Sequence, residues 1–423
     1  MRTRSARISI LLVLALVVAG LATPATAKKP APEPVTVLGF FDGDPADAFV
    51  AELETVAKGR YDIIYEAVND AGEMVDRVTG PNPPDLIVSP IPGLLIDLAD
   101  ELVDLGEFVN PRSLRRDYGD FLIDVVTGDG AVLGGPVNAI TKSLVWYQPG
   151  EFAANGYAIP QTFTELVALS DQMVANGDVP WCNYIESGPA TGWLGTDWVE
   201  DLLLGAEGPD VYDQWVNHTV VFQDPRVEMA FDRYQQMIDT PGYVWDRGNM
   251  TSVPFFNNVF PLGFEDCLMH KQGAFFAAIL EFNGFDLDDF AAFKFPSVDP
   301  AYADAVMGGA DHVAALNERK EVRQLTRYIL SQRFGRQGLA GTGGWILPNV
   351  RFDTRHYMDD LIRSQAEDIQ AAIRADQFRY DGSDMMPPEV GQGTFWTGIV
   401  DLVNGVKDVP EVLEDIDDSW PPS

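Results

Sequence analysis

Residues 35–68 read VTVLGFFDGDPADAFVAELETVAKGRYDIIYEAV, and this stretch decides the fold class. Val35–Phe41 is an apolar run of strand length, Pro45–Lys58 carries apolar residues at helical spacing, and Tyr61–Val68 is apolar again. The pattern continues with a helix at Gly72–Thr79, a strand at Asp85–Val88 and a helix through Leu102. Alternating strands and helices predict an α/β fold with an open, mostly parallel sheet flanked by helices.

In such sheets a ligand lies beyond the carboxyl ends of the strands. Here those ends carry Phe41-Asp42-Gly43-Asp44 and Ser89-Pro90-Ile91-Pro92. Neither turn contains G-x-G-x-x-G or G-x-x-x-x-G-K-[ST], so the sequence does not support a phosphate-binding loop. The chain also has no G-x-S-x-G elbow, and no pair among its 64 acidic residues stands out as a general acid and base.

The second half of the chain has a mainly helical pattern. Residues 28–423 are enough for two domains with sizeable cores. The expected helices are Gln161–Ala175, Asp197–Leu204, Pro209–Val216, Pro225–Thr240, Met358–Arg374, Gly393–Val403 and Pro410–Asp417.

The N-terminus predicts export. Three arginines precede the apolar run Ile8–Leu21, and Ala25-Thr26-Ala27 is a small-residue cleavage pattern, so residues 1–27 are expected to be a secretory signal cleaved near Ala27. Residues 28–34 are a Pro-rich linker. No cysteine lies nearby to carry a lipid anchor, and no later apolar run is long enough to span a membrane. We therefore expect a periplasmic or extracellular protein without direct membrane insertion.

The chain is strongly acidic, with a formal charge of −35. Loss of the signal removes three arginines and no acid, which leaves 26 bases against 64 acids and a charge of −38. Such a surface repels nucleic acid and anionic lipid. It fits a neutral or cationic ligand, and it also fits a saline habitat in which acidic surfaces stay soluble.

Two cysteines, Cys182 and Cys267, are present, and in an exported chain one disulfide between them is the economical interpretation, with two buried thiols as the alternative. The four histidines have neither H-x-x-x-H nor H-E-x-x-H spacing, so we expect no metal and no other cofactor.

The stretch Trp181–Leu204 (WCNYIESGPATGWLGTDWVEDLLL) combines three tryptophans with four carboxylates. An indole stacks on the C–H face of a sugar ring, and carboxylates accept hydrogen bonds from its hydroxyls. The alternative is a half-buried aromatic cluster, in which Asp197 only caps a helix with Glu200 as its partner, and Trp198 only packs in the core. Of the tryptophans, Trp193 is the better candidate for stacking.

Several motifs together resemble sugar-binding proteins of ABC importers, in the alpha-glucoside-type branch of the maltose-binding-like family. The resemblance runs from about Val35 to Pro421. Its motifs are Gly135–Asn138, Lys142–Tyr147, Gly156–Leu166, Ala190–Asp201 (ATGWLGTDWVED), the cysteine pair, Gly308–Asp311 (GGAD), Phe378–Pro388 and Phe395–Asp401.

The resemblance implies a two-lobed periplasmic-binding-protein fold, with each lobe an open, mostly parallel sheet flanked by helices and a hinge crossed three times. One lobe would take 35–142 and 304–347, and the other 143–303 and 348–423. A sugar, such as an alpha-glucoside or another small oligosaccharide, would lie between the lobes of a monomer. Closure of the lobes would present it to the permease subunits of the membrane.

The resemblance also implies which residues meet the ligand. Asn138 replaces a residue that is often a carboxylate, and Ile91 replaces a common glutamine, which changes the polar contacts. Trp345 is a candidate lid or hinge residue. The ligand-binding residues implied are Asp42, Ser89, Asn138, Trp193, Asp197, Trp198, Glu281, Phe282, Asp311, Trp345, Arg379, Asp384 and Trp396.

Two other functions use similar residues. A secreted glycoside hydrolase would need two carboxylates about 5 to 10 Å apart across the scissile bond. A binding protein for a cationic ligand would suit the negative charge. The leading interpretation remains a binding protein without enzymatic activity.

Overall fold

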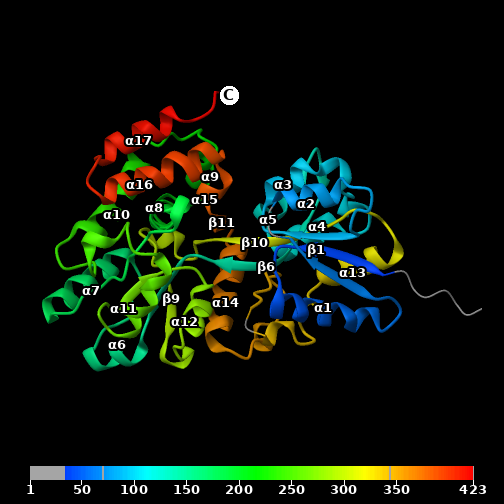
Figure 1. The fold of residues 1–423 in the computed structure, drawn as a ribbon, viewed down its shortest axis with the longest axis horizontal. Coiled ribbons are helices and arrows are strands. Elements are labelled where there is room, and N and C mark those ends of the chain that lie inside the picture. The colour runs from blue at the N-terminus through cyan, green and yellow to red at the C-terminus, as the bar shows by residue number, and fades with distance from the viewer. Residues whose placement is uncertain (1–33, 69–70, 343, 423) are drawn as a thin grey trace, which may run out of the picture.

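The computed structural model describes residues 34–422 except 69–70 and 343. The predicted signal, 1–27, lies outside the described residues, and so does the linker up to residue 33. Figure 1 shows two lobes side by side, with β6, β10 and α14 between them. The two-lobed α/β fold is therefore confirmed.

The sheet of the first lobe has six strands. β1 (Val35–Gly39) lies between β2 (Ile63–Ala67) and β3 (Leu86–Ser89), and both pairs are parallel. β10 (Val306–Ala315) runs antiparallel to β3 and to β6 (Gly135–Thr141), while β11 (Phe378–Tyr380) is parallel to β10. This sheet is mixed, because β10 runs in the opposite direction to the parallel strands β1, β2 and β3.

The sheet of the second lobe is small and differs from the expected parallel sheet. β7 (Leu144–Tyr147) is antiparallel to both β8 (Met269–Lys271) and β9 (Ala291–Lys294). β7 lies between two strands that run the other way, so neither of its two strand pairings is parallel. A two-residue hairpin pair, β4 (Thr127–Gly128) and β5 (Ala131–Val132), completes the described strands of the chain.

Helices cover both faces of the first sheet (Figure 1). The predicted helix at 45–58 is α1 (Gly43–Ala57), which buries Phe49 and Leu53 against the sheet. The other helices of this lobe are α2 (Ala71–Val78), α3 (Pro92–Asp97), α4 (Pro111–Tyr118), α5 (Phe121–Asp124), α13 (Lys320–Ile329) and α14 (Asp360–Arg374).

The second lobe is mainly helical, as the sequence predicts. Its longest helices are α8 (Trp193–Glu207) and α10 (Pro225–Asp239), which pack against each other. A π-helical turn at Val390–Phe395 leads into α16 (Trp396–Val403). The remaining helices are α6 (Pro149–Asn155), α7 (Phe163–Asn176), α9 (Pro209–Val216), α11 (Val259–Gly263), α12 (Phe276–Phe282), α15 (Gly382–Met385) and α17 (Val409–Asp418).

Two main apolar cores show where the chain divides. One core joins residues from 145–295 with 386–416, and the other joins 35–139 with 306–380. Most of the buried residues of 352–380, including Ile369 of α14 and Phe378 of β11, pack in the core of the first lobe, although the sequence placed everything after 347 in the second. The pairing of β11 with β10 holds them there, so we propose a third crossing between the lobes near residue 381.

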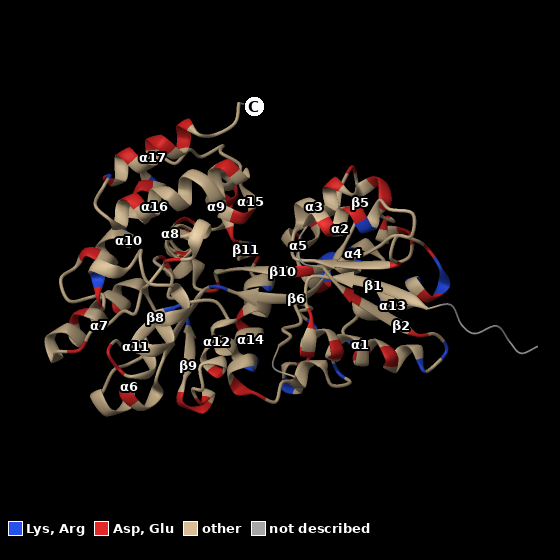
Figure 2. Cartoon of the chain, viewed as in Figure 1, with Lys and Arg blue, Asp and Glu red and all other residues tan. Residues whose placement is uncertain are grey.

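A disulfide joins Cys182 to Cys267 within the second lobe, as predicted. Within the described ranges, no helix combines the length and apolar character needed to cross a membrane. Acidic residues are spread over both lobes, whereas basic residues are few in this view (Figure 2).

Candidate functional site

A cavity of about 490 Å³, here called the main chamber, lies where the two lobes meet. Its first wall is the turn after β3, and its floor comes from β6 and β10, which run between the lobes. The opposite wall is the segment that follows β11. The lining residues are Pro90–Gly93, Asn138, Ile140, Lys142, Gly308–Asp311, Tyr380, Asp381, Asp384, Met385 and Gln392.

A second cavity of about 220 Å³, the aromatic chamber, adjoins the first. The two share three lining residues, Lys142, Asp381 and Asp384, so they are adjacent parts of one cleft. Trp193, Phe275 and Trp396 form the walls of the aromatic chamber. One part of the cleft therefore offers polar groups, and the other offers flat apolar surfaces.

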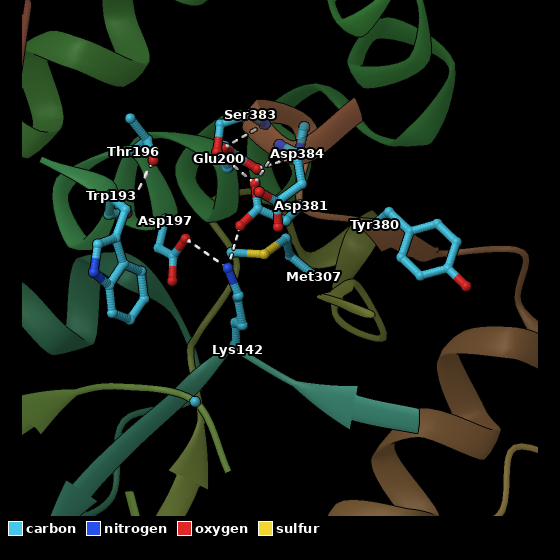
Figure 3. Close-up of polar contacts among 12 residues, drawn as sticks. Lys142, Trp193, Thr196, Asp197, Glu200, Met307, Tyr380, Asp381, Ser383 and Asp384 are labelled. Carbon is cyan, nitrogen blue, oxygen red and sulfur yellow. Dashed lines mark hydrogen bonds and ion pairs between the residues drawn. The ribbon is translucent and has the colours of Figure 1, made fainter. Parts of the chain in front are cut away.

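Lys142 lies at the junction of the two chambers (Figure 3). Its Nζ forms an ion pair with Asp381, lies 3.5 Å from Oδ1 of Asp197, and lies 5.2 Å from the centre of the Trp193 ring. Burial alone would lower the pKa of Lys142, but the carboxylates of Asp197, Asp381 and Asp384 raise it well above its usual value. Lys142 is therefore a permanently charged hydrogen-bond donor.

Asp381 is held in the ionised state by this lysine. Burial would raise the pKa of its carboxyl, but the charge and hydrogen bond of Lys142 lower it to about 2.

Buried Glu200 of α8 fixes the turn after Asp381, because its carboxylate accepts hydrogen bonds from the backbone N–H groups of Gly382 and Ser383, at 2.5 and 3.1 Å. These contacts join the wall of the cleft to helix α8.

Asp311 and Asn138 form the polar floor of the main chamber. Nδ2 of Asn138 donates to Oδ2 of Asp311 at 3.0 Å, and its Oδ1 accepts the backbone N–H of Ile346 at 2.9 Å. Burial raises the pKa of Asp311 to about 6. On the opposite wall, burial and the charge of Asp381 also raise the pKa of Asp384 to about 6. The cleft thus has acceptors with spare hydrogen-bonding capacity on two sides.

Comparison with known proteins identifies the family of the chain. A model of the bacterial extracellular solute-binding protein family matches residues 42–331 of this chain. The chain belongs to this family.

Two relatives support the assignment over most of the chain. The osmoprotective compounds-binding protein GgtB of Synechocystis sp. is 40% identical and covers 92% of each chain. The alpha-glucosides-binding periplasmic protein AglE of Rhizobium meliloti is 30% identical, over 82% of this chain and 77% of the relative. The solved structure of the bacterial solute receptor AcbH has a TM-score of 0.75 at 17% identity, covering 92% of this chain and 97% of that one.

This chain is a solute-binding protein and not an enzyme. The hydrolase alternative is thereby excluded. The predicted membership of a family of extracellular solute-binding proteins is confirmed.

The cleft of the solute-binding protein brings together six of the residues named from its sequence. Asn138 and Asp311 line the main chamber, Asp384 lies at the junction, and Trp193 and Trp396 line the aromatic chamber. The sixth is Asp197, a buried residue that reaches the cleft through Lys142.

The expected helix cap at Asp197 was wrong. Helix α8 begins four residues earlier, at Trp193, and its N-cap is Gly192, whose φ of +117° suits a glycine. Asp197 consequently lies inside the helix, and its side chain faces Lys142. The buried ion pair decides its position, and sequence spacing alone did not reveal this partner.

Two tryptophans named as ligand contacts are buried in the lobes instead. Trp198 packs against Trp181, with ring centres 4.8 Å apart, and is 2% exposed. Trp345 stacks on Phe49 at 5.4 Å in the first core and is 1% exposed. The core interpretation of Trp198 therefore fits the structure, and Trp345 is not placed as a lid.

Three further residues lie away from both chambers. Nε of Arg379 donates to Asp213 at 2.7 Å, so this arginine joins β11 to α9 and does not pair with Asp384. Phe282 is 91% exposed at the end of α12, next to exposed Glu281. Neither residue of α12 lines the cleft, because the helix turns them outward.

Two strand-end residues lie next to the cleft without lining it. Ser89 is fully buried, and its Oγ accepts the backbone N–H of Ile91 at 3.1 Å, which shapes the turn that forms the wall. Asp42 is exposed at the start of α1 and lines neither chamber. The turn after β3 therefore borders the cleft, whereas Asp42 in the turn after β1 does not.

Sequence reasoning missed Lys142 and Asp381, although both lie in motifs that carried the resemblance. A lysine directly after an apolar strand could have indicated a buried partner, since an unpaired charge is rarely buried. The partner itself is 239 residues away in sequence, so only the fold reveals it.

Proposed function

We propose that the cleft captures a small neutral sugar or glycoside, such as an alpha-glucoside, and delivers it to the permease of an ABC transporter. The observation that carries this proposal is the aromatic chamber, which opens into a chamber lined by carboxylates around Lys142. The names of the two relatives, which refer to osmoprotective compounds and alpha-glucosides, support the same class of ligand.

Each part of the cleft matches one part of such a ligand. Sugar hydroxyls donate hydrogen bonds to Asp311 and Asp384 and accept one from Lys142. The C–H face of a ring stacks on Trp193 or Trp396. The main chamber, at about 490 Å³, lies within the range of ordinary small-molecule sites. The charge of Lys142 disfavours a cationic ligand at the junction.

The proposal is tested by calorimetry of the mature protein with sucrose, trehalose, maltose, maltotriose and galactose, with glycine betaine and spermidine as charged comparisons. We expect at least one neutral sugar to bind with a Kd in the micromolar range, about −8 kcal/mol. Binding of spermidine or glycine betaine, together with no response to any sugar, would overturn the proposal.

Trp193→Ala is expected to weaken sugar binding by at least tenfold, because it removes a stacking surface, worth about 1 kcal/mol or more beyond area burial. Trp193 is half-buried against Phe255 and Phe275, so the loss of stability is expected to be moderate. Phe282→Ala is the matched control, since this exposed aromatic lies outside the cleft. Equal affinity of the two variants would show that Trp193 has only a structural role.

We further propose that the protein is exported, that its signal is cleaved near Ala27, and that it acts as a monomer whose lobes close around the ligand. Intact-mass measurement of the protein from its host tests the cleavage, because each alternative N-terminus gives a different mass.

A further inference from the structure

A third cavity, of about 560 Å³, lies on the first lobe, and we call it the basic pocket. It is formed by the last turn of α1 and the residues just after it, together with α13 and the segment that follows α13. Lys58, Arg60, Arg333 and Arg336 line it, and no acidic residue does. This is unusual in a chain in which acidic residues outnumber basic ones by more than two to one.

None of these four cations forms an ion pair with a carboxylate that the structure describes. More than half of the other described basic residues do, as Arg77 and Arg319 illustrate. The Nε of Arg336 is buried, and no described residue accepts a hydrogen bond from it. Four positive charges therefore converge without a counter-charge on the wall of the pocket.

A buried acidic group next to the pocket is already engaged. Glu52, buried beneath the pocket, accepts hydrogen bonds from the hydroxyl of Tyr328 and from the backbone N–H groups of Gly335, Gln337 and Leu339. These bonds fix the backbone of the segment that carries Arg333 and Arg336. A backbone that is ordered in advance lowers the entropy cost of binding, and it holds the exposed Arg333 and the partly buried Arg336 on the same side of the pocket.

The basic pocket is separate from the sugar cleft. The two share no lining residue. Lys58 and Arg60 directly precede β2, at the amino ends of the parallel strands, whereas the cleft begins at the turn after the carboxyl end of β3. A ligand in the basic pocket would leave the cleft free.

We propose that the basic pocket is a second binding site, which takes a phosphate-bearing anion. Guanidinium groups bind phosphate oxygens in pairs, and a phosphate presents acceptors in several directions. Lys58, Arg333 and Arg336 supply donors around the cavity, and Arg60 adds its charge while two of its N–H groups donate to the backbone carbonyls of Val56 and Ala57. A single carboxylate, with two oxygens in one plane, would leave most of these donors without a partner. The anion is either a free phosphate compound or the headgroup of a phospholipid.

Calorimetry of the full mature chain at low salt, with inorganic phosphate and with pyrophosphate, tests the free anion. Sedimentation with vesicles of phosphatidylglycerol and phosphatidylcholine, compared with phosphatidylcholine alone, tests the headgroup. Binding in either arm, weakened by added salt, supports the proposal and identifies the source. The absence of binding in both arms overturns it.

The variant Arg333→Gln/Arg336→Gln is expected to bind the anion at least tenfold more weakly, because two charge-assisted contacts are lost. Arg112→Gln/Lys320→Gln is the matched control, since it removes two exposed positive charges of the same lobe from outside the pocket. Equal weakening of both variants would show a general charge effect and overturn the proposal. Sugar affinity should be unchanged in both, so this test does not depend on the identity of the sugar.

Discussion

At the scale of single residues, Lys142 connects parts of the chain that are distant in sequence. Its ammonium group interacts with Asp197 from helix α8 and with Asp381 from the segment after β11. Removing charges from water costs free energy, and the mutual attraction of the three groups offsets this cost only while all of them are present. The cluster therefore links stability to the geometry of the cleft.

Lys142→Met is expected to lower the free energy of unfolding by about 3–5 kcal/mol at pH 7, because it leaves the buried carboxylate of Asp381 without its ion-pair partner. Urea unfolding measures the loss. Lys407→Met is the control, because Lys407 forms its ion pairs at the surface, where solvent screens the attraction and a pair adds little stability. If Lys142→Met/Asp381→Asn regains no stability over Lys142→Met, the pair does not carry the effect.

Asp311 makes the stability depend on pH. Its pKa is about 6 in the folded protein and close to 3.9 in an unfolded chain. Between pH 4 and 6 the folded state retains a proton that the unfolded state has lost, so stability rises as the pH falls from 7 toward 4, by on the order of 2–3 kcal/mol from this residue.

Asp311→Asn is expected to be more stable than the wild type at pH 7, and this advantage should shrink as the pH falls toward 4, measured as unfolding midpoints of both proteins at several pH values. The difference between the two proteins is the quantity compared, because burial lowers the pKa values of His270 and His312 to about 4 and these residues oppose Asp311 over the same range. The measurements are kept above pH 4, because Asp381, with its lowered pKa, acts in the opposite direction below that point. Identical profiles of variant and wild type would assign the dependence to other groups.

At the scale of secondary-structure elements, the cleft depends on where α8 and α16 begin. Trp193 and Trp396 are the first residues of these two helices, so both aromatic walls are set by helix starts. The two helices approach closely at Gly192, where an added Cβ would lie 2.2 Å from the carbonyl oxygen of Trp396.

Gly192→Ala is therefore expected to lower the free energy of unfolding by about 2 kcal/mol or more, since both the backbone conformation and the space require glycine. It should also weaken sugar binding by displacing the two tryptophans. Gly188→Ala is the control, because that glycine has a positive φ but open space around it. Comparable losses in the two variants, measured by urea unfolding, would indicate a backbone effect without any role for the contact.

Sequence predicted the elements well where local patterns decide them. The helix expected at Pro209–Val216 is α9 with the same bounds, and Pro225–Thr240 differs from α10 by one residue. Prediction failed where partners are distant in sequence. The antiparallel sheet of the second lobe and the start of α8 depend on contacts that spacing cannot show. The same limit explains why Trp193 was recognised as a cleft residue, while Lys142 was not.

At the scale of the whole molecule, the cleft has walls from both lobes, so a ligand that contacts both favours a closed arrangement. A compact chain of this length has a radius of gyration of about 21 Å. We expect small-angle X-ray scattering to show a decrease in this radius when a bound sugar is added. Trp193→Ala at the same sugar concentration should show little change. An unchanged radius in the wild type at saturation would contradict closure.

The sheet of the first lobe also has a consequence for how the chain acquires its structure. β3 ends at residue 89, but its neighbour β10 spans Val306–Ala315, so more than two hundred residues must be made before this edge of β3 is covered. At roughly 5–20 residues per second, the strand edge stays open for on the order of ten seconds or more during synthesis. Pairings so distant in sequence also slow folding itself. An exposed strand edge invites pairing with other chains, so the newly made protein has a long interval in which it needs protection from aggregation.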